Sequence, residues 1–147
     1  PDSPSALTSD QGWDTLKESS FLTEITARLK EQGIRVSIFL DASPRMVEGA
    51  ASIGADRVEF YTGPFAAQYR TDPRAAIAGH IAAAQEASQL NVGVNAGHDL
   101  NLDNLRFYAS MIPNLLEVSI GHALVCDALY YGLSNVIGMY QHQLRSI

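Results

Sequence analysis

The stretch Val92-Gly93-Val94-Asn95-Ala96-Gly97-His98-Asp99-Leu100 decides the fold of this chain. A short β-branched run leads into a glycine turn and then into a histidine, just before a helical pattern begins. In α/β proteins, catalytic and binding side chains usually lie at this point, where a strand ends. The stretch Val118-Ser119-Ile120-Gly121-His122-Ala123-Leu124 repeats the arrangement. Two such corners in succession predict one shared site.

Strand and helix patterns alternate on both sides of these corners. Residues 1–14 are rich in Pro, Ser and Asp and are predicted to form a frayed loop. Four strands are predicted at 35–41, at 57–62, from Val92 onward and at 117–120. Helices are predicted over 15–32, from a Ser43-Pro44 start to 53, and over 73–89, 105–112, 122–131 and 134–144. Repeated strand and helix units in one domain, 1–147, predict parallel strands joined by right-handed crossovers.

The faces of the predicted strands distinguish two architectures. In an open doubly wound sheet the central strands are covered on both faces and should be apolar throughout. Here Val58 and Phe60 alternate with Arg57, Glu59 and Tyr61, and the other strands alternate in the same way. One apolar and one polar face predict a (β/α)8 TIM barrel with helices outside and a polar lumen. Four strands make half of such a barrel, because a whole one needs about 250 residues.

Composition narrows the classes of function. The 147 residues carry a net charge of −6 and no cluster of Lys or Arg, which argues against a nucleic-acid partner. The single cysteine, Cys126, cannot form an internal disulfide, and no pair of residues suggests a metal site. We therefore expect a cytoplasmic protein without a metal or another cofactor. No run approaches the about 18 apolar residues of a membrane span, so no membrane partner is expected.

Three motifs resemble those of the pyridoxine 5′-phosphate synthase family, barrel enzymes that close the vitamin B6 ring. They are Val58-Glu59-Phe60-Tyr61-Thr62-Gly63, Val94-Asn95-Ala96-Gly97-His98-Asp99-Leu100-Asn101 and Ser119-Ile120-Gly121-His122-Ala123-Leu124. The resemblance runs from about Thr8 to Gln143. It implies that the chain supplies strands five to eight of the barrel, that its partners are small phosphorylated substrates, and that it is a homo-oligomer.

The resemblance also implies a reaction. Family members condense 1-deoxy-D-xylulose 5-phosphate with 3-amino-2-oxopropyl phosphate, releasing phosphate and water. Carried over by motif, His98 is the expected proton donor and Glu59 stabilises charged intermediates. Asp99, Gly121 and His122 are expected to bind the aminoketone phosphate, Asp99 through its backbone N–H because a carboxylate would repel phosphate. Tyr61 stands where some members carry histidine and is given no catalytic role.

Elementary chemistry agrees with these assignments. Histidine both gives and takes protons near neutral pH, since its unperturbed pKa is about 6.5. A carboxylate in a lumen balances a cationic intermediate. The Gly121 corner at a helix start is suited to an anion. The resemblance places the general bases in the first half of the barrel, so the 147 residues alone are expected to be inactive.

Other interpretations of the same residues remain open at this stage. Glu59 could pair with Arg57, Glu117 is expected to be a structural ion-pair partner, and Asp41 could be a helix-start or loop carboxylate. His80 and His142 are predicted to be solvated, and Cys126 to be a small buried residue. The chain could also be a half-barrel that binds a phosphorylated metabolite without converting it. An open flavodoxin-like domain is a weaker third hypothesis, because of the polar strand face.

Overall fold

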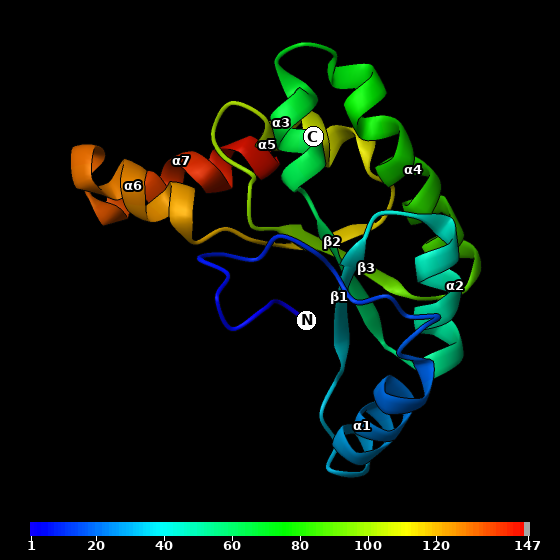
Figure 1. Ribbon diagram of the computed structural model, residues 1–147. Helices are drawn as coiled ribbons and strands as arrows, with labels where there is room; N and C mark the ends of the chain where they lie inside the picture. Colours follow the sequence, from blue (N-terminus) through cyan, green and yellow to red (C-terminus); the bar gives the residue numbers. More distant parts are fainter. Residues whose placement is uncertain (146–147) are drawn as a thin grey trace.

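The computed structural model describes residues 1–145 and has an α/β fold built on one parallel sheet (Figure 1). The sheet has four strands in the order β1-β2-β3-β4, so each strand pairs with the next strand along the chain. The strands are β1 (Ser37–Asp41), β2 (Arg57–Tyr61), β3 (Gly93–Gly97) and β4 (Leu115–Ser119). The predicted parallel α/β fold is therefore confirmed.

One helix precedes the sheet, others connect its strands, and the last two follow β4. They are α1 (Ser19–Glu31), α2 (Pro44–Ile53), α3 (Gly63–Tyr69), α4 (Pro73–Gln89), α5 (Leu105–Met111), α6 (His122–Tyr131) and α7 (Leu133–Arg145). Local signals explain several of their ends. The Asp72 carboxylate accepts a hydrogen bond from the Ala75 N–H at the start of α4. Gly54 ends α2 in the left-handed conformation that glycine adopts freely. Ser43, expected to cap α2, makes no capping hydrogen bond with its side chain.

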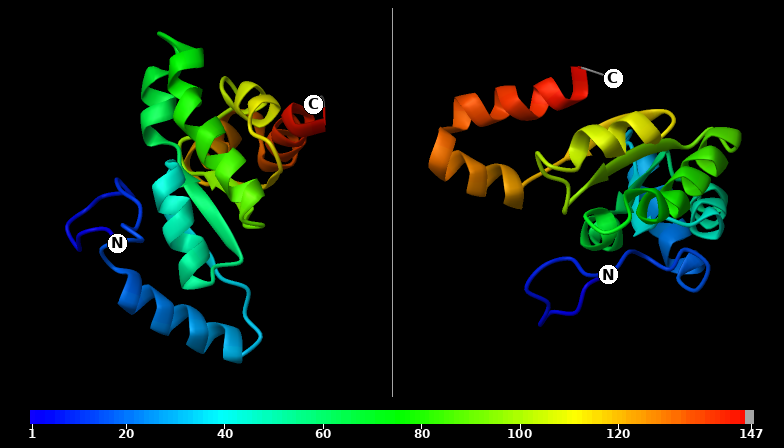
Figure 2. Two further views of the ribbon diagram at one scale, coloured as in Figure 1. Left: turned by 90° about the vertical axis from the view of Figure 1, so that its right-hand side faces the viewer. Right: turned by 90° about the horizontal axis from the view of Figure 1, so that it is seen from above.

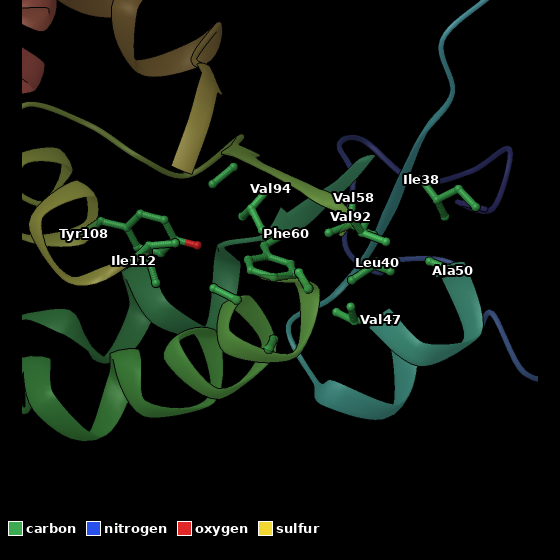
Figure 3. Close-up of a cluster of buried hydrophobic side chains, with 14 of the residues drawn as sticks. Ile38, Leu40, Val47, Ala50, Val58, Phe60, Val92, Val94, Tyr108 and Ile112 are labelled. Atoms are coloured by element: carbon green, nitrogen blue, oxygen red, sulfur yellow. The ribbon is translucent and has the colours of Figure 1, made fainter. Parts of the chain in front are cut away.

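The core lies between one face of the sheet and the helices α2 and α4 (Figures 1 and 3). Leu40, Val58 and Phe60 are fully buried, and Figure 3 shows Leu40 facing Val47 of α2. These residues belong to the apolar face that the period-two alternation predicts. Burial of that stripe under the helices fixes the register of the strands, because a shift of one residue would turn every apolar side chain toward the other face.

The opposite face of the sheet is polar, and no helix covers it in the part of the chain described. The N-terminal segment runs along this side instead (Figure 2). The Trp13 N–H donates to the Phe39 carbonyl at 2.8 Å. A Cβ atom on Gly12 would lie 2.3 Å from the Leu40 Cα, so only glycine allows this close approach to β1. The segment is a loop, as predicted, but it is not frayed at this point, because these contacts hold it against β1.

Strand β4 differs from the prediction of 117–120. It begins two residues earlier, at Leu115, and ends at Ser119. Its register with β3 shifts between Val94 and Asn95, which pair with Leu115 and Glu117 respectively, so Leu116 is an extra residue in the strand. A bulge of this kind interrupts the period-two alternation, and the alternation was the signal used to predict the strand.

Helix α3 is not among the predicted helices. Because α3 covers His80, the prediction for that residue is affected as well. Gly63-Pro64 looks like the end of a strand, but proline is also well suited to the first turn of a helix. Phe65 of α3 is fully buried and packs against His80, which is itself only 6% exposed. The prediction that His80 is solvated is therefore wrong. Cys126, predicted to be buried, is exposed on α6.

Across residues 1–145, no helix combines the length and the apolar content that crossing a lipid bilayer requires.

Candidate active site

The register of the sheet brings polar side chains of three strands into one row. Glu59 of β2 pairs with Asn95 of β3, and Asn95 pairs with Glu117 of β4. Because paired residues in a parallel sheet project to the same side, all three side chains lie on the polar face. Phe39 of β1 continues the row on the other side of Glu59. Glu59 therefore lies near the middle of the polar face.

Gly97 allows the Glu59 carboxylate to approach the backbone of β3. A Cβ atom at position 97 would lie 3.1 Å from Glu59 Oε1 and 2.2 Å from the Ser119 carbonyl oxygen. A side chain at this position would push β4 away and displace the carboxylate. The Asn-Ala-Gly-His motif thus has a steric reason for its glycine.

His98 follows Gly97 in a tight turn at the carboxyl edge of the sheet. Its φ of 49° is left-handed, which is uncommon for a residue with a side chain. Two neighbouring strand ends stabilise the turn. The His98 N–H donates to the Ser119 carbonyl at 3.0 Å, and the buried Thr62 hydroxyl donates to the Gly97 carbonyl. The turn directs the imidazole away from the core.

Both ring nitrogens of His98 have partners. Nδ1 lies 2.8 Å from Asp99 Oδ2, and Nε2 lies 2.7 Å from the Thr8 hydroxyl. The Asp99 N–H donates to Thr62 Oγ1 at 3.2 Å. The backbone N–H of Asp99, expected to bind phosphate, therefore already has a protein partner. Its carboxylate faces the imidazole.

A cavity of about 710 Å³ brings most of the predicted site residues together. Glu59, His98, Gly121 and His122 line it, and Asp99 lies beside it, bonded to His98. The rest of the lining comes from the N-terminal segment, β1 and the end of β4: Pro1, Asp2, Ser9, Trp13, Phe39, Ser119 and Ile120. Asp41, expected at a helix start or in a loop, is the last residue of β1 and accepts a weak hydrogen bond of 3.4 Å from the Gly12 N–H.

Burial alters the chemistry of two residues on β2. It raises the pKa of Glu59, although the nearby His98 partly opposes this change. Burial also raises the pKa of Tyr61, and the negative charges of Asp99, Asp10 and Asp41 act in the same direction. Tyr61 is therefore a neutral phenol at physiological pH. Its ring packs edge-on against Phe39 and forms an apolar wall beside the imidazole of His98.

The second corner supplies backbone amides. Gly121 precedes α6, and the first N–H groups of a helix have no partner within the helix. Together with the helix dipole they favour an anion. His122 is exposed at the mouth of the cavity. Nothing lies within 4 Å of a Cβ atom built on Gly121, so there is open space at this corner.

Arg57 pairs with Glu117, not with Glu59. Its guanidinium donates to Glu117 and, at 3.2 Å, to Asn95 Oδ1, at the amino-terminal end of the sheet. Glu117 is thus an ion-pair partner, as predicted. Because Arg57 is occupied by these two residues, the Glu59 carboxylate is left facing the cavity.

Thr8, Ser9 and Thr62 were not predicted as site residues. Thr8 is 90 positions from His98 in the sequence, and no local pattern reports such a contact. The family resemblance begins at about Thr8, which is the one signal that could have included it. In the described part of the chain, no group of three or more His, Cys, Asp or Glu side chains could hold a metal ion.

Comparison with known proteins agrees with the resemblance. The family described as "Pyridoxal phosphate biosynthesis protein PdxJ" matches residues 1–146. The chain is similar to a protein of Cytophaga hutchinsonii named pyridoxine 5′-phosphate synthase, with 55% identity over 99% of this chain and 61% of the relative. Proteins of the same name from Flavobacterium johnsoniae and Bacteroides thetaiotaomicron are 49% and 51% identical over the same shares.

The chain spans about three fifths of the length of these curated relatives. The family match, in contrast, covers nearly every residue of the chain itself. The protein therefore belongs to the PdxJ family of pyridoxal phosphate biosynthesis proteins.

Proposed function

We propose that this chain is part of a pyridoxine 5′-phosphate synthase, which condenses 1-deoxy-D-xylulose 5-phosphate with 3-amino-2-oxopropyl phosphate and releases phosphate and water. One observation carries the proposal: Glu59 and His98 line the same cavity, beside the helix start at Gly121. A carboxylate, an imidazole and an anion corner suit a condensation of phosphorylated substrates that needs proton transfer.

We propose that the four strands are strands five to eight of a (β/α)8 barrel. Three features support this arrangement. The strands are parallel and sequential, α2 and α4 cover one face, and the other face carries Glu59, Asn95 and Glu117. About two fifths of each curated relative lies outside the match, and four further strands would be drawn from that part. Such strands would pair with the edges of β1 and β4 and close the lumen.

In this proposal His98 donates a proton to a departing oxygen atom. His98 lines the cavity, and its Nε2 is already within hydrogen-bond distance of one oxygen atom, that of Thr8. Glu59 stabilises cationic intermediates formed from the amine. Its partly buried position strengthens such an interaction, because the surrounding dielectric is lower than that of water. A Cβ atom on Gly97 would lie 3.1 Å from Glu59 Oε1, so the carboxylate occupies space that this glycine leaves open.

Gly121 and His122 are proposed to bind the phosphate of the aminoketone. Amides at the start of α6 and an imidazole are the proposed donors, and no Lys or Arg belongs to the described lining of the cavity. Asp99 was expected to contribute its N–H, and it could do so only by sharing or leaving its bond to Thr62. Gly121 and His122 therefore carry most of the proposed phosphate contact.

We further propose a homo-oligomer located in the cytoplasm. α6 exposes Leu129 and Tyr130 at 82% and 86%, and apolar side chains exposed to this degree favour association. The cytoplasmic location follows from the substrates, because doubly charged phosphate esters do not cross a bilayer unaided.

The experiment uses the protein at its native length, which is determined by measuring the intact mass of the protein purified from its own cells. The purified protein is incubated with both substrates, and pyridoxine 5′-phosphate is identified by mass spectrometry. We expect product, and we expect Glu59→Gln and His98→Asn to reduce its rate of formation. The 147 residues alone, assayed in parallel, are expected to form none.

Two results would contradict the synthase. Saturable binding of the aminoketone phosphate by the native-length protein, with no product when both substrates are present, would instead identify a binding module. Product formation that is unaffected by either substitution would show that the cavity described above is not the catalytic site.

A further inference from the structure

We propose that Asp99 is a positioning residue that keeps His98 in the tautomer with its hydrogen on Nδ1, so that Nε2 is the nitrogen that exchanges protons with the substrate. This inference rests on the proposed function, because it assigns a partner to the proposed proton donor. Asp99 itself does not touch the reacting atoms. It acts through His98.

The geometry of the pair carries the inference. Asp99 Oδ2 lies 2.8 Å from His98 Nδ1, and the two side chains are only 34% and 28% exposed. Neighbouring residues in a strand would point to opposite sides, but the left-handed turn at His98 brings these two side chains together. The strain of that backbone conformation is balanced by the bonds of the turn to Ser119 and Thr62.

The backbone of Asp99 is fixed at both of its polar groups. Its N–H donates to Thr62 Oγ1 at 3.2 Å, and its carbonyl accepts a hydrogen bond of 3.4 Å from Asn104 Nδ2. Asn104 is itself 2% exposed. The carboxylate is therefore presented to His98 from a supported backbone, which lowers the entropy cost of keeping the pair aligned.

An ionised carboxylate accepts hydrogen bonds and donates none. The hydrogen between Asp99 and His98 must therefore come from Nδ1. In the neutral imidazole this leaves Nε2 as the acceptor, and the Thr8 hydroxyl can donate to it at 2.7 Å. Nε2 thus carries a lone pair when the ring is neutral and a transferable proton when the ring is charged, and its partner in the structure is the Thr8 hydroxyl.

The proton balance of the proposed step is simple. The imidazolium carries one hydrogen on each nitrogen. The Nε2 proton passes to the departing oxygen, which keeps the electron pair of its breaking C–O bond, and the electron pair of the N–H bond stays on the ring. The product is a neutral imidazole with its one hydrogen on Nδ1, still bonded to Asp99. The carboxylate stabilises the charged ring before transfer and fixes the tautomer after it.

Other ionisable groups also lie near His98 and are alternatives to Asp99 as its partner. Glu59 and Tyr61 approach from β2, His122 from α6, and Asp2 from the N-terminal segment. In the described chain, Asp99 is the one of these that makes a hydrogen bond to an imidazole nitrogen of His98.

The decisive experiment is ¹⁵N nuclear magnetic resonance of the histidine-labelled protein at its native length, at a pH where the His98 ring is neutral. The His98→Asn spectrum assigns the signal. We expect Nδ1 to carry the hydrogen in the native protein, and Asp99→Ala to move it mainly to Nε2. Asp99→Asn, which keeps an oxygen acceptor but loses the charge, is expected to give a mixture of both tautomers.

Activity supplies the second readout. Asp99→Ala is expected to lower kcat about tenfold to a hundredfold, less than the roughly 10²–10⁴-fold that a general acid itself contributes, because the imidazole of His98 stays in place. KM is expected to change less than about twofold. Asp103→Ala is the matched control, because Asp103 belongs to the same loop and pairs with Arg70 at 2.7 Å on the surface, with its side chain 63% exposed. It is expected to leave the tautomer and kcat unchanged.

Three outcomes would overturn the inference: hydrogen on Nε2 in the native protein, an unchanged tautomer in a folded Asp99→Ala variant, or a changed tautomer with native kcat. Failure of the proposed function looks different. In that case the native protein forms no pyridoxine 5′-phosphate, while the tautomer measurement still decides whether Asp99 positions His98.

Discussion

Nδ1 of His80 lies 2.9 Å from the hydroxyl oxygen of Tyr108, and the pair joins α4 to α5 in the core beneath the sheet. The rings of Phe60 and Phe65 each contact the imidazole at a centroid distance of 5.9 Å. Burial lowers the pKa of His80 to about 4, because a charged ring would lose its hydration among these side chains. The folded protein therefore keeps His80 neutral.

The free energy of unfolding should depend on pH through His80. The pKa of His80 is about 4 in the folded protein, against a usual value of 6.5, so the unfolded chain binds the proton more tightly. The stabilisation is fully present above pH 6.5 and is lost as the pH falls toward 4. The loss amounts to about 3 kcal/mol in the free energy of unfolding. Urea unfolding at pH 7, 6, 5 and 4 measures it.

His80→Gln isolates this effect, because glutamine keeps a hydrogen-bonding group near Tyr108 but does not titrate. We expect its free energy of unfolding to change much less between pH 6.5 and 4. His122→Gln, at an exposed position, is the control and should keep the native pH dependence. An unchanged slope in His80→Gln would show that His80 is not the responsible group.

A methyl group at Gly97 should disrupt the sheet edge. Because its Cβ would lie 2.2 Å from the Ser119 carbonyl oxygen, Gly97→Ala must separate β3 from β4. We expect a loss of about 3 kcal/mol in the free energy of unfolding. Gly121→Ala adds the same atom where nothing lies within 4 Å, and its stability should change by less than about 1 kcal/mol. Equal effects of the two substitutions would refute the steric argument.

Glu59→Gln should separate activity from stability. Burial raises the pKa of Glu59, so the charged carboxylate is less stable in the folded chain than in the unfolded one. The charge therefore lowers stability as the pH rises above the ordinary value of 4.5. We expect the neutral glutamine to raise Tm at pH 7, because a partly buried charge in an active site lowers stability. We also expect it to lower kcat. A lower Tm together with native kcat would contradict both expectations.

A negative charge at Gly121 should weaken phosphate binding. Gly121→Glu places a carboxylate in the proposed anion corner, and we expect at least a tenfold weaker affinity for inorganic phosphate in calorimetric titration. Gly138→Glu adds the same charge on the exposed side of α7, away from the cavity, and should leave the affinity unchanged. If the two variants bind phosphate equally well, the anion corner is elsewhere.

Two arginines test the difference between a partly buried ion pair and an exposed one. Arg57, whose side chain is 16% exposed, donates to Glu117 and Asn95, and Arg57→Met should cost about 2 kcal/mol in stability. Arg28 pairs with Glu24 at 3.7 Å on the surface of α1, with both side chains about 70% exposed. Arg28→Met should change stability by less than about 0.5 kcal/mol. Thermal and urea unfolding of both variants check the contrast.

Local pattern was sufficient for most of the sheet. The alternation of Val58 and Phe60 with Glu59 and Tyr61 determines which face is buried, because side chains of a strand alternate between its two sides. β4 was misplaced because the extra residue Leu116 interrupts that alternation. α3 was missed because a Gly-Pro pair begins a helix as readily as it ends a strand. The first error comes from an irregularity within the strand, and the second from a sequence signal that has two structural meanings.

By itself, the sequence determined the parallel α/β fold, its polar face and the two glycine-histidine corners, since these depend on residues close together in the chain. Only the tertiary structure decided that Thr8 reaches His98, that Arg57 chooses Glu117 over Glu59, and that His80 is buried against Phe65. These contacts join distant segments, and no local periodicity encodes them. The partner of His98 at Asp99 is adjacent in sequence, yet it too depends on the left-handed turn that Ser119 and Thr62 stabilise from neighbouring strands.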